Sequence, residues 1–267
     1  GGNITAVVYS TGTAIGGGIA HTGLGGSASV VINDGKVFAY NFGQPAHDVI
    51  AKYGSSATTE IIKAARHIAG TAIGGASSIM QSGNSSPADI TINGGYVYAE
   101  SLGGCAIGGG NSVCVTAGSA NVNINGGTVI ANSKGQDDYT FSDNITKIDI
   151  KPGVSIGGGT GGITGNGGDA NITIKNGNLT AGSIGGGSTT NPNGKLGYAK
   201  ISISGGETSG QFIMVKGAKE ACSFTMTGGK VYNSDTSSTD FARLQENGGA
   251  VYMDDPQGVA TISGGSI

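Results

Sequence analysis

The chain has 267 residues, of which 54 are glycine, only 5 are proline and 12% are charged, with a formal net charge of −3. So little proline argues against a collagen-like chain or a proline-rich linker, and the lack of a basic patch argues against nucleic acid as a partner. Hydrophobic residues reach 37%, which is enough for a buried core, but no apolar run approaches the ~20 residues needed to span a bilayer.

The first recognisable unit along the chain is a glycine turn, TAIGGGI at 13–19. A lone isoleucine before a run of glycines returns at four further places, 71–77, 105–111, 154–160 and 182–188. Glycine tolerates backbone conformations that other residues avoid, so we interpret the unit as a sharp corner with its isoleucine in the core. A phosphate-binding loop would need a helix and a Lys-Ser/Thr pair directly afterwards, and neither follows.

The second unit is VVINDGKVFA at 30–39, where apolar residues alternate on both sides of a bend. Copies stand at 90–99, 122–131, 172–181, 201–210 and 224–233, with half-copies at 1–6 and 260–267. Alternation with period two predicts strands with one buried face. Equivalent aliphatic residues should then form two columns in the core, Ile32/Ile92/Ile124/Ile174/Ile203/Met226/Ile262 and Val37/Val97/Val129/Leu179/Val231.

The spacing of the two units is fixed on one side only. From the isoleucine of a glycine turn to the second apolar residue of the next strand unit the distance is 17 to 19 residues. The other half of the repeat is not constant: it is 10 residues from Val97 to Ile107 and 36 residues from Val37 to Ile73. Insertions on one edge of a regular scaffold are typical of repeat arrays and often mark the binding edge. The sequence therefore predicts an all-β, right-handed parallel β-helix of about seven coils, forming a single domain over 1–267.

Residues 41–70 are the first insertion. The stretch TTEIIKAARHIAG at 58–70 has an apolar face and could begin at Thr58 or Thr59 and end at Gly70, which predicts one short amphipathic helix. Outward-facing strand residues at one repeat position could lie beneath it, namely Phe38, Tyr98 and Ile130. Two alternatives follow: the helix covers this column, or the column is an exposed aromatic platform that stacks on sugar faces.

Residues 133–151 are the second insertion, and they carry Asp137, Asp138 and Tyr139. Clustered carboxylates in a loop could hold Ca²⁺, which prefers six to eight oxygen ligands. The spacing does not match an EF-hand, and GNGGDAN at 165–171 is a single echo of a Ca²⁺-binding repeat. We therefore expect a solvated acidic loop and no cofactor, with Ca²⁺ as the alternative.

The cysteines and histidines show no metal-ligand spacing. Cys105, Cys114 and Cys222 form no CxxC motif, and we expect three buried thiols, with a Cys105–Cys114 disulfide as the alternative. The three histidines lie in no zinc-binding arrangement; they are His21, His47 and His67.

The segment FTMTGGKVYN…ENGGAVYM…ATISGGSI within 224–267 resembles the glycine-rich repeats of bacterial cell-surface parallel β-helix proteins. The AIGGG…ITINGGYVYA units are similar to those of large surface proteins of gut Firmicutes, often described as adhesins or carbohydrate-binding modules. The similarity covers most of the chain apart from 41–70 and 133–151. It implies an extracellular module at the bacterial surface. Because the chain starts and stops inside a repeat, we expect a piece of a larger surface protein.

The expected function is therefore a non-enzymatic adhesin or stalk module, with a host or dietary glycan or a surface protein as partner. We assign no catalytic residue and place ligand binding on Tyr96, Tyr98, Asp137, Asp138 and Tyr139, which combine flat apolar faces with acceptors. The alternative is a polysaccharide-active lyase or glycoside hydrolase with its site on the insertion-bearing edge, where Glu100 and the Asp137/Asp138 pair are candidate acids. An ice-binding array would need a regular column of threonine side chains, and the corresponding outward column of this chain mixes threonine with asparagine and serine. This function is therefore disfavoured.

Overall fold

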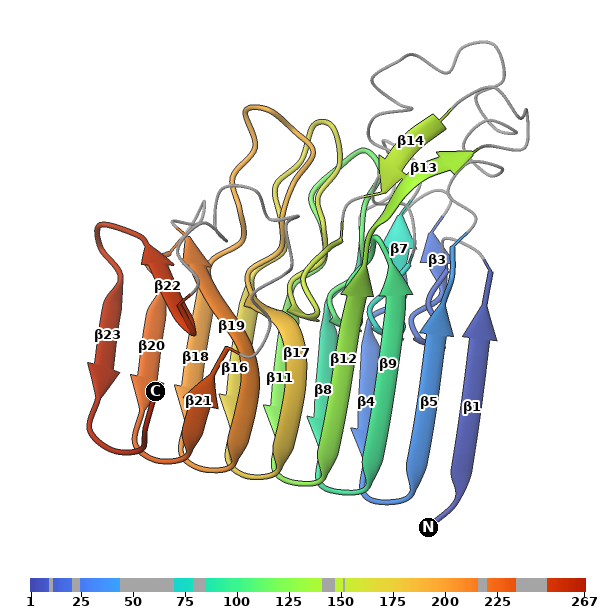
Figure 1. Ribbon diagram of the computed structural model, residues 1–267. Coiled ribbons are helices and arrows are strands. Elements are labelled where there is room, and N and C mark those ends of the chain that lie inside the picture. Colours follow the sequence, from blue (N-terminus) through green and yellow to red (C-terminus); the bar gives the residue numbers. More distant parts are fainter. Residues whose placement is uncertain are drawn as a thin grey trace.

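The structure is a computed structural model. The structure describes residues 1–9, 12–20, 25–43, 70–78, 85–140, 147–150, 152–215, 220–233 and 249–267. Within these ranges the only regular secondary structure is β-strand (Figure 1). All strand pairs are parallel except one antiparallel pair. The all-β prediction is confirmed for the described residues, and the helix predicted at 58–69 lies outside them.

One sheet has seven parallel strands in the order β23-β20-β18-β16-β11-β8-β4. Its strands are β4 (Ala28–Ile32), β8 (Ala88–Ile92), β11 (Ala120–Ile124), β16 (Ala170–Ile174), β18 (Ala199–Ile203), β20 (Ser223–Met226) and β23 (Val259–Ile262). Strands of the second sheet alternate with these along the chain, so strands that are neighbours in the seven-stranded sheet come from successive repeats.

The second sheet has twelve strands. The longer ones are β1 (Asn3–Val8), β5 (Lys36–Asn41), β9 (Tyr96–Leu102), β12 (Thr128–Lys134), β17 (Asn178–Gly185), β19 (Glu207–Val215), β21 (Lys230–Tyr232) and β22 (Val251–Asp254). The two-residue strands are β2 (Ile15–Gly16), β6 (Ile73–Gly74), β10 (Ile107–Gly108) and β15 (Ile156–Gly157). Two small pairs stand apart, β3 (Ile19–Ala20) with β7 (Ser77–Ser78), and β13 (Gln136–Thr140) with β14 (Lys147–Ile150).

The two large sheets lie face to face, and their strands run in opposite directions (Figure 1). A strand of the seven-stranded sheet, the tight glycine-containing turn that follows it and the next strand of the twelve-stranded sheet are together called a layer below. The tight turns line one edge of the stack of layers, and the longer connections leave from the opposite edge.

Equivalent residues of neighbouring layers pair as the sequence predicts. Ile92 pairs with Ile32 on one side and with Ile124 on the other, and the column continues to Ile262. The members of this column are at most 7% exposed, except Ile262 at 55%. Ile262 is exposed because β23 is an edge strand of its sheet. The first predicted core column is thus confirmed, apart from the burial of its last member.

The glycine turns bring backbones into direct contact. Of the five isoleucines that precede the glycine turns, Ile73, Ile107, Ile156 and Ile184 are fully buried, which confirms their predicted place in the core. Ile15 is half-buried and packs against the core. Gly108 has a φ of 151°, a conformation that favours glycine. Gly118 N donates to Gly110 O at 2.9 Å within one repeat, and Gly159 N of the next repeat donates to Gly118 O at 3.0 Å. The glycine segments of neighbouring repeats are therefore hydrogen-bonded to each other, and a Cβ at Gly109 would lie 1.9 Å from Gly118 O.

The second core column contains one residue that the sequence analysis did not place there. Thr208 pairs with Leu179 on one side and Val231 on the other, and it is fully buried. Its Oγ1 has no hydrogen-bond partner among the described residues. A buried hydroxyl without a partner costs free energy, so Thr208 is a weak point of the core.

A Thr208→Val variant should be more stable than the parent chain by about 1–2 kcal/mol, because valine has nearly the same shape and removes the unpartnered hydroxyl. Chemical denaturation followed by circular dichroism measures the difference. The matched control is Thr173→Val on the outward side of β16, which should change stability by less than about 0.5 kcal/mol. An unchanged or reduced stability of Thr208→Val would show that the hydroxyl is satisfied.

Candidate functional site

Aromatic side chains gather on the outward face of β5 and β9. Strand alternation turns Val37 and Ala39 into the core, where both are buried, and turns Phe38 and Tyr40 outward. On β9 the same alternation turns Tyr96 and Tyr98 outward. Because β5 and β9 pair in register, Phe38 lies beside Tyr98 and the rings of neighbouring layers meet.

Four of the rings form a continuous row. The ring centroids of Tyr9 and Phe42 are 5.4 Å apart, those of Phe42 and Tyr40 are 5.6 Å apart, and those of Tyr40 and Tyr98 are 5.5 Å apart. A second pair, Phe38 and Tyr96, is separated by 5.7 Å. These are ordinary separations for interacting aromatic rings. The six residues Tyr9, Phe38, Tyr40, Phe42, Tyr96 and Tyr98 are called the aromatic surface below.

An ordered polar network borders the aromatic surface at Tyr98. The Tyr98 hydroxyl donates to Glu100 Oε2 at 2.6 Å, and Lys134 Nζ contacts the same oxygen at 2.8 Å. Asn132 Nδ2 in turn donates to the Tyr98 hydroxyl at 3.4 Å. The Glu100 side chain is only 11% exposed, whereas that of Lys134 is 56% exposed. The network therefore holds the Tyr98 ring from its hydroxyl end and presents an ammonium group to solvent.

The protonation states of this network follow from its geometry. Burial, followed by the hydrogen bond to Glu100, raises the pKa of the Tyr98 phenol. The hydrogen bond to Glu100 raises the pKa of Lys134. At neutral pH the phenol is thus a neutral donor and the lysine is charged, so both continue to engage the carboxylate of Glu100.

The structure brings two of the predicted binding residues together and places the other three on a different element. Tyr96 and Tyr98 both lie on the aromatic surface; Tyr96 follows directly after the turn glycine Gly95, so it lies toward the tight-turn edge. Asp137, Asp138 and Tyr139 lie on β13, which pairs antiparallel with β14. The expectation of an acidic loop at these positions is wrong, because their backbone forms a strand. Their side chains lie outside the described part of the structure.

Three aromatic residues of the surface were missed by the sequence analysis: Tyr9, Tyr40 and Phe42. The signal was present, since Tyr40 and Phe42 follow Phe38 at intervals of two and share its side of the strand. The repeat pattern ends at Ala39, so extending the alternation three residues further would have found both. Lys134 was missed because it lies in a different repeat from Glu100 and approaches it only across the β9–β12 pairing.

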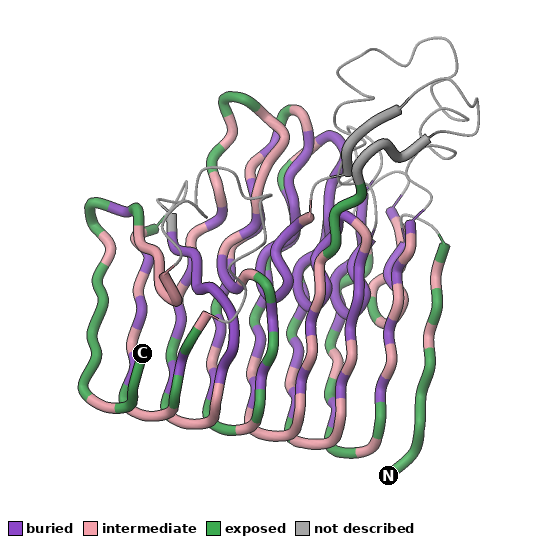
Figure 2. The backbone as a smooth tube through the Cα atoms, viewed as in Figure 1, coloured by how far each residue is buried: buried purple, intermediate pink, exposed green. Residues whose placement is uncertain are grey.

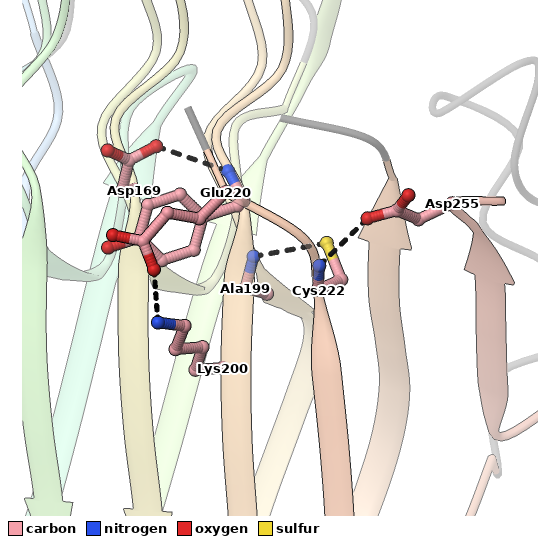
Figure 3. A network of polar contacts seen from close by, with 7 residues as sticks. Asp169, Ala199, Lys200, Glu220, Cys222 and Asp255 are labelled. Carbon is pink, nitrogen blue, oxygen red and sulfur yellow. Dashed lines mark hydrogen bonds and ion pairs between the residues drawn. The ribbon is translucent and has the colours of Figure 1, made fainter. Parts of the chain in front are cut away.

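A second polar network lies where β16, β18 and β20 begin (Figure 3). Tyr198 N donates to Asp169 Oδ1 at 3.2 Å, and Lys200 forms an ion pair with Glu220. Burial first, and then the charges of Asp169 and Glu220, raise the pKa of Tyr198. The Lys200 ammonium lies 5.3 Å from the centroid of the Tyr198 ring, so it covers that ring.

The other half of this network joins neighbouring layers through backbone groups. Cys222 N donates to Asp255 Oδ2 at 2.8 Å, and Ala199 N donates to Cys222 Sγ at 3.4 Å (Figure 3). Asp255 Oδ1 also accepts from Gln257 N at 3.0 Å. These groups hold strand ends together, so we assign the network a structural role.

The three cysteines are buried free thiols, as predicted, and the alternative disulfide is not formed. Burial raises the pKa of Cys105 to about 12, which keeps it protonated and unreactive. Among the residues that the structure describes, no three His, Cys, Asp or Glu side chains gather into a metal-binding group. The three histidines lie outside these residues. Within the same part of the chain, no helix has the length and apolar character needed to cross a membrane.

The site with the clearest capacity to bind a ligand is thus the aromatic surface with its bordering network. Its rings are half-buried, apart from Tyr9, which is 62% exposed. Comparisons with protein-family models, with curated proteins and with solved structures find no match to this chain.

Proposed function

We propose that this chain is a non-enzymatic module that binds a glycan on its aromatic surface, as part of an adhesin or stalk at a bacterial cell surface. The row of four rings from Tyr9 to Tyr98 is the observation that carries the proposal. Aromatic faces stack on the apolar C–H faces of sugars, and nearby polar groups bond the sugar hydroxyls. A row, rather than a single ring, suits an extended chain of sugars.

The bordering network supports the same ligand class. Glu100 holds Tyr98 in place, so the ring needs little further ordering when a ligand binds. Lys134 is more than half exposed and offers donors beside the row. Orientation of one ring and donors at its edge together favour a polar, hydroxyl-rich ligand over a purely apolar one.

The scaffold that we propose for this module is a right-handed parallel β-helix of about seven coils. Its support is the alternation of successive strands between two parallel sheets and the pairing of equivalent residues across layers. Such a stack is a rigid rod that can project a binding face away from a surface. The resemblance of its repeats to those of bacterial surface proteins supports an extracellular place.

A non-catalytic role agrees with the use of Glu100. Glycosidases act with two carboxyl groups placed on either side of the scissile bond, whereas Glu100 Oε2 is engaged by both Tyr98 and Lys134. A carboxylate held in this way orients its neighbours. The experiment must therefore distinguish a glycan that is bound without degradation from one that is degraded by a polysaccharide-active enzyme.

A glycan array, run beside assays for released sugars, is expected to identify a bound glycan that is not degraded. With that glycan, calorimetry should show that Tyr40→Ala weakens binding about fivefold or more, equivalent to roughly 1 kcal/mol for loss of a stacking ring. Tyr96→Ala and the Asp137→Ala/Asp138→Ala double variant extend the test to the other predicted positions. Tyr232→Ala, an outward tyrosine on β21, is the matched control and should bind normally.

Two results would count against this function. If neither Tyr40→Ala nor Tyr96→Ala loses more than about 0.5 kcal/mol of binding free energy, within the range of neutral surface changes, the glycan binds elsewhere. Release of shortened sugar products would assign the chain to the polysaccharide-active enzymes.

A further inference from the structure

Two tyrosine rings from neighbouring layers are in contact on the aromatic surface. Tyr40 on β5 and Tyr98 on β9 have ring centroids 5.5 Å apart, with an angle of 41° between the ring planes. The two strands pair in the twelve-stranded sheet, and Figure 2 shows the alternation of buried and intermediate residues along both of them. Both tyrosines are half-buried. Their rings are therefore held beside each other while part of each ring stays open to solvent.

This contact differs in kind from the other ring contacts of the described residues. Each of the others contains at least one phenylalanine, namely Tyr9–Phe42, Tyr40–Phe42, Phe38–Tyr96 and Phe212–Phe224. A phenylalanine ring has no hydroxyl proton to lose and resists the loss of one electron, whereas a tyrosine gives up both to form a neutral radical. Within this part of the chain, Tyr40 and Tyr98 are thus the two touching rings that can both become radicals.

A proton acceptor already contacts one of the two phenols. The Tyr98 hydroxyl donates to Glu100 Oε2 at 2.6 Å, which is the length expected for a hydrogen bond to a carboxylate. Lys134 Nζ contacts the same oxygen at 2.8 Å, and Asn132 Nδ2 donates to the Tyr98 hydroxyl at 3.4 Å. Both partners of a proton transfer from Tyr98 to Glu100 are therefore held in place.

This proton stays on Tyr98 until the ring is oxidised. Burial, followed by the hydrogen bond to Glu100, raises the pKa of the Tyr98 phenol, so the phenol is neutral at physiological pH. Removal of one electron leaves a positive charge on the ring and makes its hydroxyl strongly acidic. A carboxylate that already accepts the hydrogen bond then takes the proton as a general base, without a search for geometry.

We propose that Tyr40 and Tyr98 form a site of oxidative modification, at which a one-electron oxidant joins the two rings as dityrosine. A peroxidase supplied with hydrogen peroxide is an oxidant of this class. One electron passes from Tyr98 to the oxidant, and the hydroxyl proton passes to Glu100 Oε2, which leaves a neutral tyrosyl radical. Tyr40 loses one electron to a second equivalent of the oxidant and its hydroxyl proton to solvent.

Coupling of the two radicals completes the modification. The unpaired electron of a tyrosyl radical is shared between the oxygen and the ring carbons next to it, the Cε atoms. The ring torsion of tyrosine is broad, so the two rings can turn until one Cε of each meets the other and a C–C bond forms. The hydrogen on each joined carbon then moves to its phenol oxygen. In total the oxidant gains two electrons, solvent gains two protons, and the chain becomes two hydrogens lighter.

The product is a covalent link between two layers. Because β5 and β9 come from different repeats and are joined through their paired backbones, the new bond constrains the unfolded chain as a disulfide would. It also fixes two rings of the aromatic surface relative to each other. The inference does not depend on glycan binding and would stand if no glycan bound.

Oxidation of the whole chain by a ruthenium(III) complex, generated by light, tests the site. With the protein dilute enough to suppress contacts between copies, dityrosine fluorescence should appear in the monomer fraction, and peptide mass mapping should place most of it between Tyr40 and Tyr98. Tyr40→Phe and Tyr98→Phe keep the rings and remove one hydroxyl each, so each should lose nearly all of this signal. Tyr232→Phe, on the outward side of β21, is the matched control and should keep the parent's yield.

A Glu100→Gln variant tests the proton acceptor separately. Glutamine has the same shape and can still accept the Tyr98 hydrogen bond through its amide oxygen, but it is a far weaker base. The initial rate of dityrosine formation should fall about tenfold or more, as for loss of a general base. Imidazole added as a soluble base should restore much of this rate, while the parent chain should respond little to imidazole.

Several results would overturn the proposal. They are the absence of dityrosine in the parent chain, a cross-link that maps mainly to another pair of tyrosines, and a parental yield in Tyr98→Phe. An unchanged rate in Glu100→Gln, or a loss of rate that imidazole does not restore, would contradict the transfer of the proton to Glu100. Circular dichroism melting of each variant shows that a lost cross-link is not lost folding.

Discussion

An Ile124→Asp variant should fail to fold. Ile124 is 1% exposed and lies in the middle of its core column, between Ile92 and Ile174. A carboxylate at this position would be an unpaired charge with apolar layers on both sides, which costs several kcal/mol. Loss of the isoleucine packing adds about 2–5 kcal/mol, and the total is comparable to the ~5–15 kcal/mol stability of a typical domain.

The neighbouring residue supplies the control for this charge. Asn123 lies on the outward side of β11, where an aspartate remains in contact with water. Asn123→Asp should therefore be soluble and melt cooperatively near the temperature of the parent chain, while Ile124→Asp should be insoluble or show no cooperative transition. A soluble Ile124→Asp protein with an unchanged melting temperature would refute the core columns.

Replacing Gly168 with alanine should destabilise the chain by more than about 3 kcal/mol, at or beyond the upper end of what overpacking usually costs. An alanine Cβ at this position would lie 1.9 Å from Gly118 O and 2.7 Å from Gly118 C. Gly118 has little freedom to move away, because its N donates to Gly110 O at 2.9 Å and its O accepts from Gly159 N at 3.0 Å. The added methyl group would force successive layers apart.

Gly26→Ala is the matched control for this substitution. A Cβ at Gly26 would approach nothing closer than Gly17 O at 3.4 Å, so its effect on stability should be below about 1 kcal/mol. Denaturant unfolding of both variants measures the contrast. Equal unfolding midpoints would mean that the glycine segments do not pack backbone to backbone.

The core columns could be predicted from the sequence because alternation with period two and the Gly-Gly bend fix both the facing and the register of each strand. Ile92 and Ile124 occupy the same place in units that differ elsewhere, and the structure pairs them. Thr208 was missed because only aliphatic residues were placed in the columns, although the repeat copy at 201–210 puts this threonine at the position that Val37 has in the unit at 30–39. Its burial follows from its position between Leu179 and Val231.

The aromatic surface was predictable only in part. Tyr96 and Tyr98 lie within the repeat unit, where equivalence between units shows which side they face. Tyr9 directly follows β1 and Phe42 directly follows β5, so the contact between their rings depends on the pairing of β1 with β5. The Glu100–Lys134 ion pair depends in the same way on two strands from different layers. Contacts between layers depend on how the repeat units stack, and the sequence of a single unit does not predict them.

The core and the aromatic surface both depend on in-register stacking of equivalent residues, and disulfide cross-linking tests this stacking most directly. Asn123 and Thr173 are paired across β11 and β16, and paired residues in neighbouring strands lie about 4.8 Å apart, within the range that a disulfide spans. An Asn123→Cys/Thr173→Cys variant under mild oxidation should form this cross-link nearly completely, as read by peptide mass mapping. The off-register variant Asn123→Cys/Asn171→Cys should not, since the diagonal exceeds about 7 Å. Cross-linking of the off-register pair, or none in the paired positions, would contradict the stacking.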